Sequence, residues 1–259
     1  MSYAAFADYY DTLTQNVEYP ERADYFCRLF DHLQHSPGLT LDLACGTGSL
    51  TLELACRGMD VYGVDASPEM LSAAQQKAAE KGENILFLCQ DMRSLDLYGT
   101  VNTVLCTLDS INHLTEISDL QSAFDRVSLF LEPDGYFIFD VNTVYKHRCI
   151  LKNEAFVYDT DAVYCVWQNR YDLADGKHLV EISLDFFERQ GQVYQRSSER
   201  FVERAYPTKV LQECLERAGL IWVACYGDLT LLPPEEDCQR VVVVARKPTK
   251  VKGVFYGTR

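Results

Sequence analysis

Long apolar runs and a leader-like N-terminus are both missing from this chain of 259 residues. No uninterrupted apolar stretch approaches the roughly 18 residues needed to cross a bilayer. The first residues, Met1-Ser-Tyr-Ala-Ala-Phe, lack the basic region and apolar run of a signal peptide. These absences predict a protein that is neither exported nor inserted into a membrane.

Closely spaced cysteine pairs are also missing, although the chain has ten cysteines. They are scattered without any C-x-x-C motif, and several, including Cys106 and Cys165, lie in apolar segments. This pattern predicts reduced thiols and a cytoplasmic location. No metal site is expected, because the five histidines have no cysteine pair at ligand spacing.

Basic residues are scarce, with 24 Lys and Arg against 38 Asp and Glu and a formal net charge of -14. Such a balance repels a phosphate backbone and argues against nucleic acid as a partner. Basic residues gather only at the C-terminal end, where Arg246 precedes the tail 247–259. That tail is expected to be a solvated end, with contact to an acidic partner as the alternative.

What the chain does contain is a regular alternation of apolar strand-like and helix-like segments. Such alternation predicts a parallel sheet covered by helices on both faces. The expected strands are 39–43, 61–64, 85–88, 101–106, 136–141, 221–226 and 241–245.

The alternation is interrupted between about 154 and 206 by three segments with strand periodicity, 162–171, 178–187 and 193–202. Turn signals separate them, so an antiparallel meander inserted into the α/β frame is expected. The expected division is a main domain, 1–153 and 207–246, whose N-terminal segment is 1–38. Residues 154–206 are expected to form an aromatic-rich cap over an acceptor pocket, with a separate core of the insert or a dimer face as the alternatives. Residues 247–259 form the expected tail.

A glycine turn after the first expected strand carries the most information. In Leu41-Asp42-Leu43-Ala44-Cys45-Gly46-Thr47-Gly48, the glycines permit positive φ and let a ligand approach the backbone. Asp65 lies seventeen residues further on, where its carboxylate can accept hydrogen bonds from both hydroxyls of an adenosine ribose. Together these features predict an adenosine nucleoside site; a ligand-free turn and a simple helix-terminal charge are the alternatives.

Two further segments end at the same predicted sheet edge. Asp91-Met92 supplies a polar group and a soft apolar side chain, suited to an adenine amine and ring face. The segment Thr107-Leu108-Asp109-Ser110-Ile111-Asn112-His113 follows the fourth expected strand. Open α/β sheets bind ligands at the carboxyl ends of their strands, so these groups are expected in one site.

In their order and spacing these motifs resemble the class I S-adenosylmethionine-dependent methyltransferases. The resemblance is strong over residues 39–141 and includes a bacterial small-molecule subgroup containing glycine and amino-sugar N-methyltransferases. It implies a Rossmann-like methyltransferase fold with a seven-stranded sheet whose last strand is antiparallel. It also implies S-adenosyl-L-methionine as cofactor and S-adenosyl-L-homocysteine as product. Ala44 departs from the family pattern, since most members have glycine there.

The resemblance assigns cofactor-binding roles along the chain. It places the methionine part near the first turn, the ribose at Asp65, and the adenine between the next two motifs. The implied set is Tyr3, Tyr10, Asp42, Ala44, Cys45, Gly46, Thr47, Gly48, Asp65, Ala66, Met70, Asp91, Met92, Thr107 and Leu108.

The acceptor side is less well defined, because methyl transfer from a sulfonium requires mainly alignment and water exclusion. Candidate catalytic residues are His113, Asp109 and Asn112; His113 is a candidate general base, with a structural role as the alternative. A small-molecule acceptor is expected, with amine nitrogen favoured over oxygen. An NAD-dependent oxidoreductase and a cofactor-binding regulator without turnover are the alternatives, and oligomeric state is not predicted.

Overall fold

The computed structural model describes residues 17–161 and 163–249. Tyr3, Tyr10 and most of the C-terminal tail therefore lie outside the described residues. Within the described part, five α-helices are present: α2 (Tyr19–Leu33), α3 (Ser49–Cys56), α4 (Pro68–Lys81), α5 (Ile117–Phe130) and α6 (Thr208–Arg217). Three short helices accompany them: η1 (Met92–Ser94), η2 (Ser110–His113) and η3 (Lys146–Leu151).

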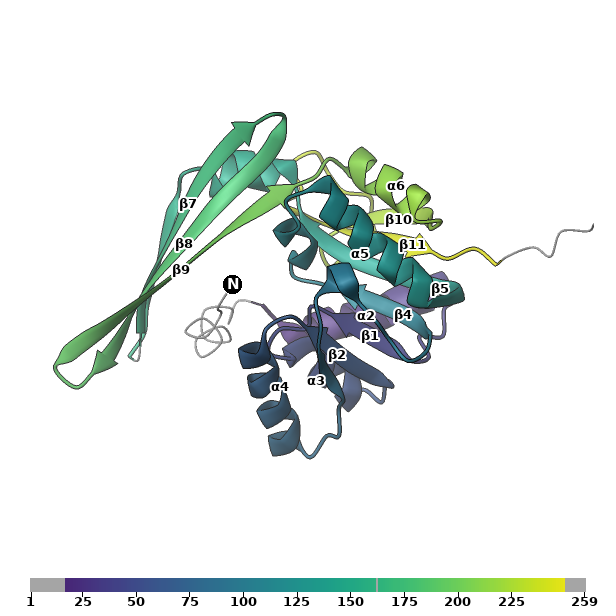
Figure 1. The fold of residues 1–259 in the computed structure, drawn as a ribbon, viewed down its shortest axis with the longest axis horizontal. Helices are drawn as coiled ribbons and strands as arrows, with labels where there is room; N and C mark the ends of the chain where they lie inside the picture. Colours follow the sequence, from purple (N-terminus) through teal and green to yellow (C-terminus); the bar gives the residue numbers. More distant parts are fainter. Residues whose placement is uncertain (1–16, 162, 250–259) are drawn as a thin grey trace, which may run out of the picture.

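The described main domain is built on a seven-stranded sheet of order β10-β11-β5-β4-β1-β2-β3 (Figure 1). Its strands are β1 (Thr40–Leu43), β2 (Val61–Asp65), β3 (Phe87–Cys89), β4 (Val101–Cys106), β5 (Leu131–Asn142), β10 (Ile221–Gly227) and β11 (Arg240–Arg246). Strand β1 pairs in parallel with β2 and β4, whereas β11 is antiparallel to both β5 and β10. The predicted mostly parallel sheet with an antiparallel last strand is confirmed.

Alternation along β5 shows how the sheet is covered on both faces. Phe137 and Phe139 are fully buried in a cluster with residues of α5 and α6. Ile138, between them, is buried in a second cluster with residues of α2 and α3. Successive side chains of a strand point to opposite faces, so two helical layers enclose the sheet and leave its carboxyl edge for ligand.

The second sheet, which we call the lid, has the order β6-β7-β8-β9. Its strands are β6 (Ala155–Asp159), β7 (Val163–Ala174), β8 (Lys177–Gln190) and β9 (Val193–Ala205), all paired antiparallel. Figure 1 shows it as a long twisted sheet that projects from one end of the main domain. The lid has its own buried cluster, which includes Cys165, Leu184 and Phe186, and Met70 of α4 joins that cluster.

The expectation of three strands in this region was wrong, because β6 is a fourth. Most of its side chains are exposed, so its sequence lacks the alternation of buried and exposed positions on which strand prediction depends. Its backbone pairing with β7, from Ala155 opposite Gln168 to Asp159 opposite Tyr164, defines the strand instead.

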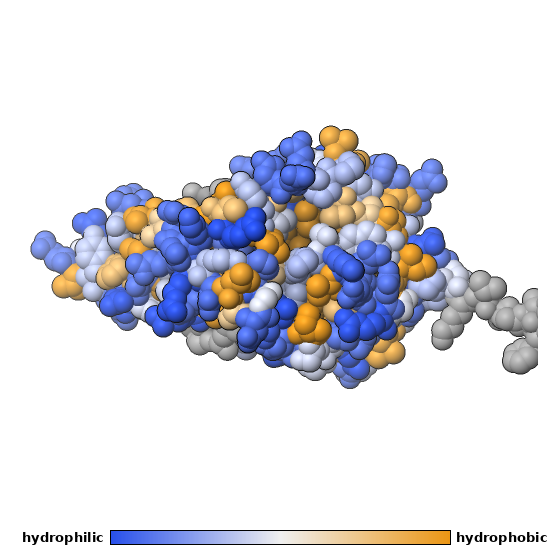
Figure 2. Space-filling model, turned by 90° about the horizontal axis from the view of Figure 1, so that it is seen from above, coloured by the Kyte–Doolittle hydropathy of each residue, from blue (hydrophilic) through white to orange (hydrophobic). Residues whose placement is uncertain are grey.

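Seen from above, the outer surface of the whole molecule is largely hydrophilic, with hydrophobic side chains in small groups (Figure 2).

Candidate active site

The turn between β1 and α3 contains three residues with positive φ, but they have different surroundings. Ala44, Gly46 and Gly48 have φ values of 60°, 55° and 70°. A Cβ on Gly46 would meet no atom within 4 Å, whereas one on Gly48 would lie 2.8 Å from the Ala74 Cβ. Gly46 thus keeps an open space beside the turn, and Gly48 allows α3 and α4 to pack closely. Ala44 adopts the conformation that glycine favours, at a cost of about 1 kcal/mol.

Asp65, at the carboxyl end of β2, is tied to this turn by backbone hydrogen bonds. Its two carboxylate oxygens accept from the Gly46 N–H and the Ser67 N–H, both at 2.8 Å. Burial raises the pKa of Asp65, and these N–H donors only partly offset that effect. The carboxylate is therefore held in a fixed orientation between the turn and the start of α4.

Asp42 lies beneath the same turn and is 1% exposed. Thr51 donates a hydrogen bond of 2.6 Å to its carboxylate. Burial raises the pKa of Asp42 to about 7 despite this hydrogen bond. Since its surroundings penalise the charged form, a cation beside the turn would stabilise the carboxylate.

A cavity of about 840 Å³ begins at this turn and extends to the lid. A small cavity of about 30 Å³ adjoins it and shares four lining residues with it, Ala44, Gly46, Leu108 and Ser110. The predicted cofactor residues that line the large cavity are Ala44, Gly46, Asp65, Ala66, Met70, Asp91, Met92 and Leu108. Those that line the small one include Asp42, Cys45 and Thr107.

Two predicted cofactor residues, Thr47 and Gly48, line neither of these cavities. Thr47 is buried just before α3, and Gly48 packs against α4 as described above. Asp91 does line the cavity, but its carboxylate is held by the backbone N–H and guanidinium of Arg93. The Arg93 hydrogen bonds lower the pKa of Asp91.

The segment after β4 is fixed by a residue that the sequence did not reveal. Leu108 and Asp109 both have positive φ, and their N–H groups donate to the Asp140 carboxylate at 2.9 and 2.8 Å. Asp140 is fully buried at the end of β5 and also pairs with Arg240 and Arg22. This network of buried charges holds the segment in its strained conformation.

The three predicted catalytic residues have different environments. Asp109 pairs with Arg240; burial opposes its ionisation, but Arg240 and Lys146 together hold its pKa well below the usual range. Asp109 is therefore an ionised acceptor of hydrogen bonds. His113 lines the cavity, with its side chain 29% exposed, and its ring centroid lies 5.2 Å from that of Phe201 of the lid, with the ring planes tilted by 40°.

Asn112 is fully buried and does not line the cavity. Its side chain accepts from the Asn142 N–H at 2.9 Å and donates to the carbonyls of Asn142 and Arg204. These hydrogen bonds join the end of β5 to strand β9 of the lid. The side chain of Asn112 is thus engaged in hydrogen bonds between β5 and β9, and the catalytic role expected from the sequence stays a prediction.

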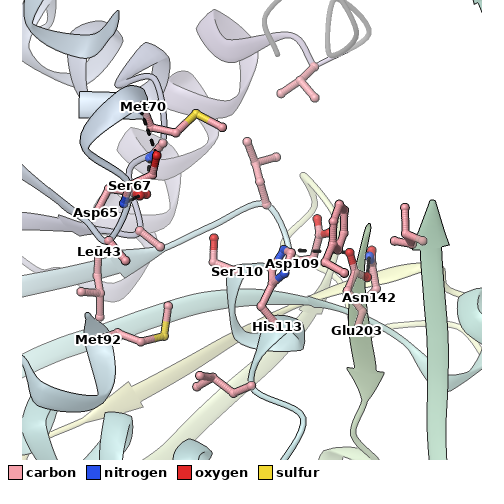
Figure 3. A pocket seen from close by; sticks show the side chains of 18 of the residues that line it. Leu43, Asp65, Ser67, Met70, Met92, Asp109, Ser110, His113, Asn142 and Glu203 are labelled. Carbon is pink, nitrogen blue, oxygen red and sulfur yellow. Dashed lines mark hydrogen bonds and ion pairs between the residues drawn. The ribbon is translucent and has the colours of Figure 1, made fainter. Parts of the chain in front are cut away.

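Several residues at the lid end of the cavity were missed by the sequence analysis. Figure 3 shows Asp65, Met70 and Met92 on one side of the cavity and His113, Asn142 and Glu203 on the other. Glu203 comes from β9, where Phe201, Glu203 and Ala205 alternate as buried residues. The strand expected at 193–202 ended one residue before Glu203, and nothing local indicated that this face meets His113. Other lining residues that were not predicted include Lys146, Phe156, Ile182 and Arg240.

Comparisons with known proteins identify the family. A family model described as a methyltransferase domain matches residues 40–135. The chain is 32% identical over 249 residues to the putative methyltransferase YqeM of Bacillus subtilis (strain 168), covering 95% of this chain and 98% of the relative. The chain also has 32% sequence identity to an S-adenosylmethionine-dependent methyltransferase from Clostridium acetobutylicum ATCC 824, whose crystal structure is known. Its TM-score is 0.85, with 95% of this chain and 99% of that chain covered. The chain belongs to the S-adenosylmethionine-dependent methyltransferases.

A more distant relative of this methyltransferase has a named acceptor. The glycine/sarcosine N-methyltransferase of Parasynechococcus marenigrum (strain WH8102) is 31% identical over 138 residues, covering 52% of this chain and 48% of the relative. The predicted class I family, enzymatic nature and S-adenosylmethionine cofactor are confirmed. The oxidoreductase and non-enzymatic interpretations are therefore set aside.

The side chains around the first turn of the methyltransferase fit this cofactor. The open space beside Gly46 admits a ligand against the backbone, and Asp65 presents a half-buried carboxylate suited to a ribose diol. Among the described residues, no group of three or more His, Cys, Asp or Glu side chains is placed to hold a metal ion. No helix in the described ranges is long and apolar enough to cross a membrane.

Proposed function

We propose that this methyltransferase transfers a methyl group from S-adenosylmethionine to the nitrogen of a small-molecule amine. The observation that carries the proposal is that one continuous cavity of about 840 Å³ runs from the Gly46 turn and Asp65 to the lid. Cavities of roughly 300–1,000 Å³ are typical of small-molecule sites. The partial match to a glycine/sarcosine N-methyltransferase supports nitrogen as the acceptor atom.

We assign the cofactor to the main-domain end of the cavity. Asp65 would accept hydrogen bonds from the ribose hydroxyls, and Ala66, Met70 and Met92 would border the adenine. Asp42, Ala44 and Gly46 would surround the methionine part, whose positive charge would stabilise the ionised form of Asp42. The bound cofactor supplies a methyl group on a positively charged sulfur.

The lid would enclose the acceptor and exclude water. We infer that it corresponds to the cap expected at 154–206, inserted between 1–153 and 207–246. Its contribution to the cavity is largely aromatic and aliphatic, with Phe156, Tyr158, Trp167, Ile182 and Phe201 among the lining side chains. Such walls suit a small organic molecule. They also strengthen the electrostatic interactions of the few polar groups there, because apolar surroundings lower the effective dielectric constant.

His113 is the group that we propose as the proton acceptor. A protonated amine has no free electron pair, so His113 would first take one proton from it. The nitrogen electron pair then forms the N–C bond as the C–S bond breaks, and the electrons of that bond remain on sulfur. Asp109 and Arg240, already paired with each other, would hold the backbone before His113 in place.

The test is methyl transfer from S-adenosylmethionine to a panel of small amines and matched alcohols, followed by S-adenosylhomocysteine release and product mass. We expect methylated amines, and His113→Ala should lower kcat at neutral pH by about 100-fold or more. Its affinity for S-adenosylhomocysteine should stay within about twofold, because His113 faces the lid end of the cavity. Preferential methylation of alcohols, or near-wild-type kcat in His113→Ala, would contradict the proposal.

A further inference from the structure

The lid contributes one carboxylate, Glu203, to the wall of the cavity. Glu203 is 3% exposed and lies on the same face of β9 as Phe201. In Figure 3 its side chain and that of His113 point toward each other at the lid end. Burying a carboxylate costs free energy unless it receives hydrogen bonds or a counter-charge. Its partners within the chain therefore show how much of this requirement is left for a ligand to meet.

The contacts of Glu203 within the described chain are few and long. Oε1 lies 4.0 Å from His113 Nε2, and Oε2 lies 3.4 Å from His147 Nε2. Asn142 Nδ2 donates to Oε2, also at 3.4 Å. Charge-assisted hydrogen bonds are normally about 2.7–2.9 Å. The carboxylate therefore keeps capacity to accept hydrogen bonds from a ligand.

The strong cations at this end of the cavity are bonded to other groups. Lys146 Nζ donates to Asn142 Oδ1 at 2.8 Å. Arg240 pairs with Asp109 and Asp140. Among the described residues, only His113 and His147 come within ion-pair distance of Glu203. The lid end thus presents a negative group without a lysine or arginine partner, inside largely apolar walls.

The spacing of the two facing atoms matches an amine. Because His113 Nε2 and Glu203 Oε1 are 4.0 Å apart, one atom can lie about 2.8 Å from both. A primary amine has two or three N–H donors and can donate to both acceptors at once, whereas a hydroxyl has one donor. We propose that Glu203 is the specificity-determining anchor of the acceptor nitrogen, binding one N–H while His113 Nε2 receives another.

This inference rests on the proposed function and adds a residue and a selection rule to it. The bonds that form and break during methyl transfer are the same as in the proposed function. Glu203 only accepts a hydrogen bond from the nitrogen, and His113 alone takes up the proton. The rule is that an amine binds more tightly than the alcohol of the same shape, and that the difference depends on Glu203.

The experiment uses 2-phenylethylamine and 2-phenylethanol as probes, titrated by calorimetry into protein saturated with S-adenosylhomocysteine. Wild-type protein should bind the amine about tenfold or more tightly than the alcohol, since a hydrogen bond to a charged group is worth that much. Glu203→Gln should bring the two affinities within about threefold of each other by weakening the amine alone. Glu181→Gln is the matched control, because Glu181 lies on β8 and pairs with Arg200.

Glu203→Asp guards against a folding defect in the glutamine variant. It keeps the charge on a shorter side chain, so its preference for the amine should lie between those of wild type and Glu203→Gln. An equal amine preference in wild type and in both Glu203 variants would overturn the anchor but leave amine methylation standing. No amine preference in wild type, or no binding of 2-phenylethylamine, would count against the anchor whatever the methylation assay shows.

Discussion

The two ends of the cavity are built in different ways. At the cofactor end, the site is shaped mainly by the backbone. Gly46 leaves open space beside the turn, and the N–H groups of Gly46 and Ser67 each donate a hydrogen bond of 2.8 Å to the Asp65 carboxylate. At the lid end, side chains from η2, η3, β5 and β9 meet across longer distances, with 3.4–4.0 Å between Glu203 and its neighbours. The cofactor end is held by short hydrogen bonds within the chain, whereas the contacts of Glu203 at the lid end are longer.

The difference suggests how one fold can serve different acceptors. A cofactor shared by a whole family is bound by backbone geometry that many sequences can form. The acceptor is bound by side chains on separate elements, which can change one at a time without disturbing the turn. Substitutions should therefore separate cofactor binding from acceptor binding. The two comparisons that follow, Asn112 with Asn102 and Gly46 with Gly48, are ordered from the larger expected effect to the smaller.

The largest effect on stability is expected where the two halves are joined. Asn112→Ala removes three hydrogen bonds and leaves the Asn142 N–H and Arg204 carbonyl without that partner. We expect a loss of about 3 kcal/mol in the free energy of unfolding, measured with urea. S-adenosylhomocysteine affinity should change less than about threefold, because Asn112 does not line the cavity.

Asn102→Ala is the control for this substitution. Asn102 also accepts a backbone hydrogen bond, from Leu39 at 3.0 Å, but it is exposed. Its loss should cost about 1 kcal/mol or less. Equal destabilisation by the two alanine variants would show that Asn112 does not join the lid to the main domain.

A smaller effect should separate the two glycines of the first turn. Gly46→Ala places a methyl group in open space, so it should weaken S-adenosylhomocysteine binding about tenfold and cost about 1 kcal/mol of stability. Gly48→Ala meets Ala74 at 2.8 Å and should cost about 2 kcal/mol while the folded protein binds nearly normally. Calorimetry measures S-adenosylhomocysteine binding by both variants, and thermal unfolding measures their stability. Weaker binding by Gly48→Ala together with the larger loss of stability in Gly46→Ala would refute the assignment.

The sequence predicted the cofactor end better than the lid end for a physical reason. The glycine turn and Asp65 lie on consecutive β-α units, so their spacing in the chain fixes their spacing in the fold. Asn112 was expected beside the acceptor because it follows β4. Its orientation depends on Asn142 and Arg204, which are 30 and 92 residues away. No local pattern could supply that information.

Glu203 shows the same limit at the acceptor site. The expected strand 193–202 stopped one residue short of it, and its pairing with His113 requires the lid to fold back over the main domain. Strand β6 was missed because its side chains are mostly exposed, and backbone pairing leaves little trace in a sequence. The fold class was predictable because it depends on periodicity, which is local.

The most direct test of the account is calorimetric titration of S-adenosylhomocysteine into cofactor-stripped protein, comparing wild type, Asp65→Ala and Asp60→Ala. Asp60 is an exposed residue just before the opposite end of β2 and serves as the control. We predict saturable binding by wild type and Asp60→Ala and a loss of about 100-fold or more in folded Asp65→Ala, because two hydrogen bonds to a charged group are removed. Unchanged affinity in Asp65→Ala, or no binding by wild type, would contradict the assignment of the cofactor site.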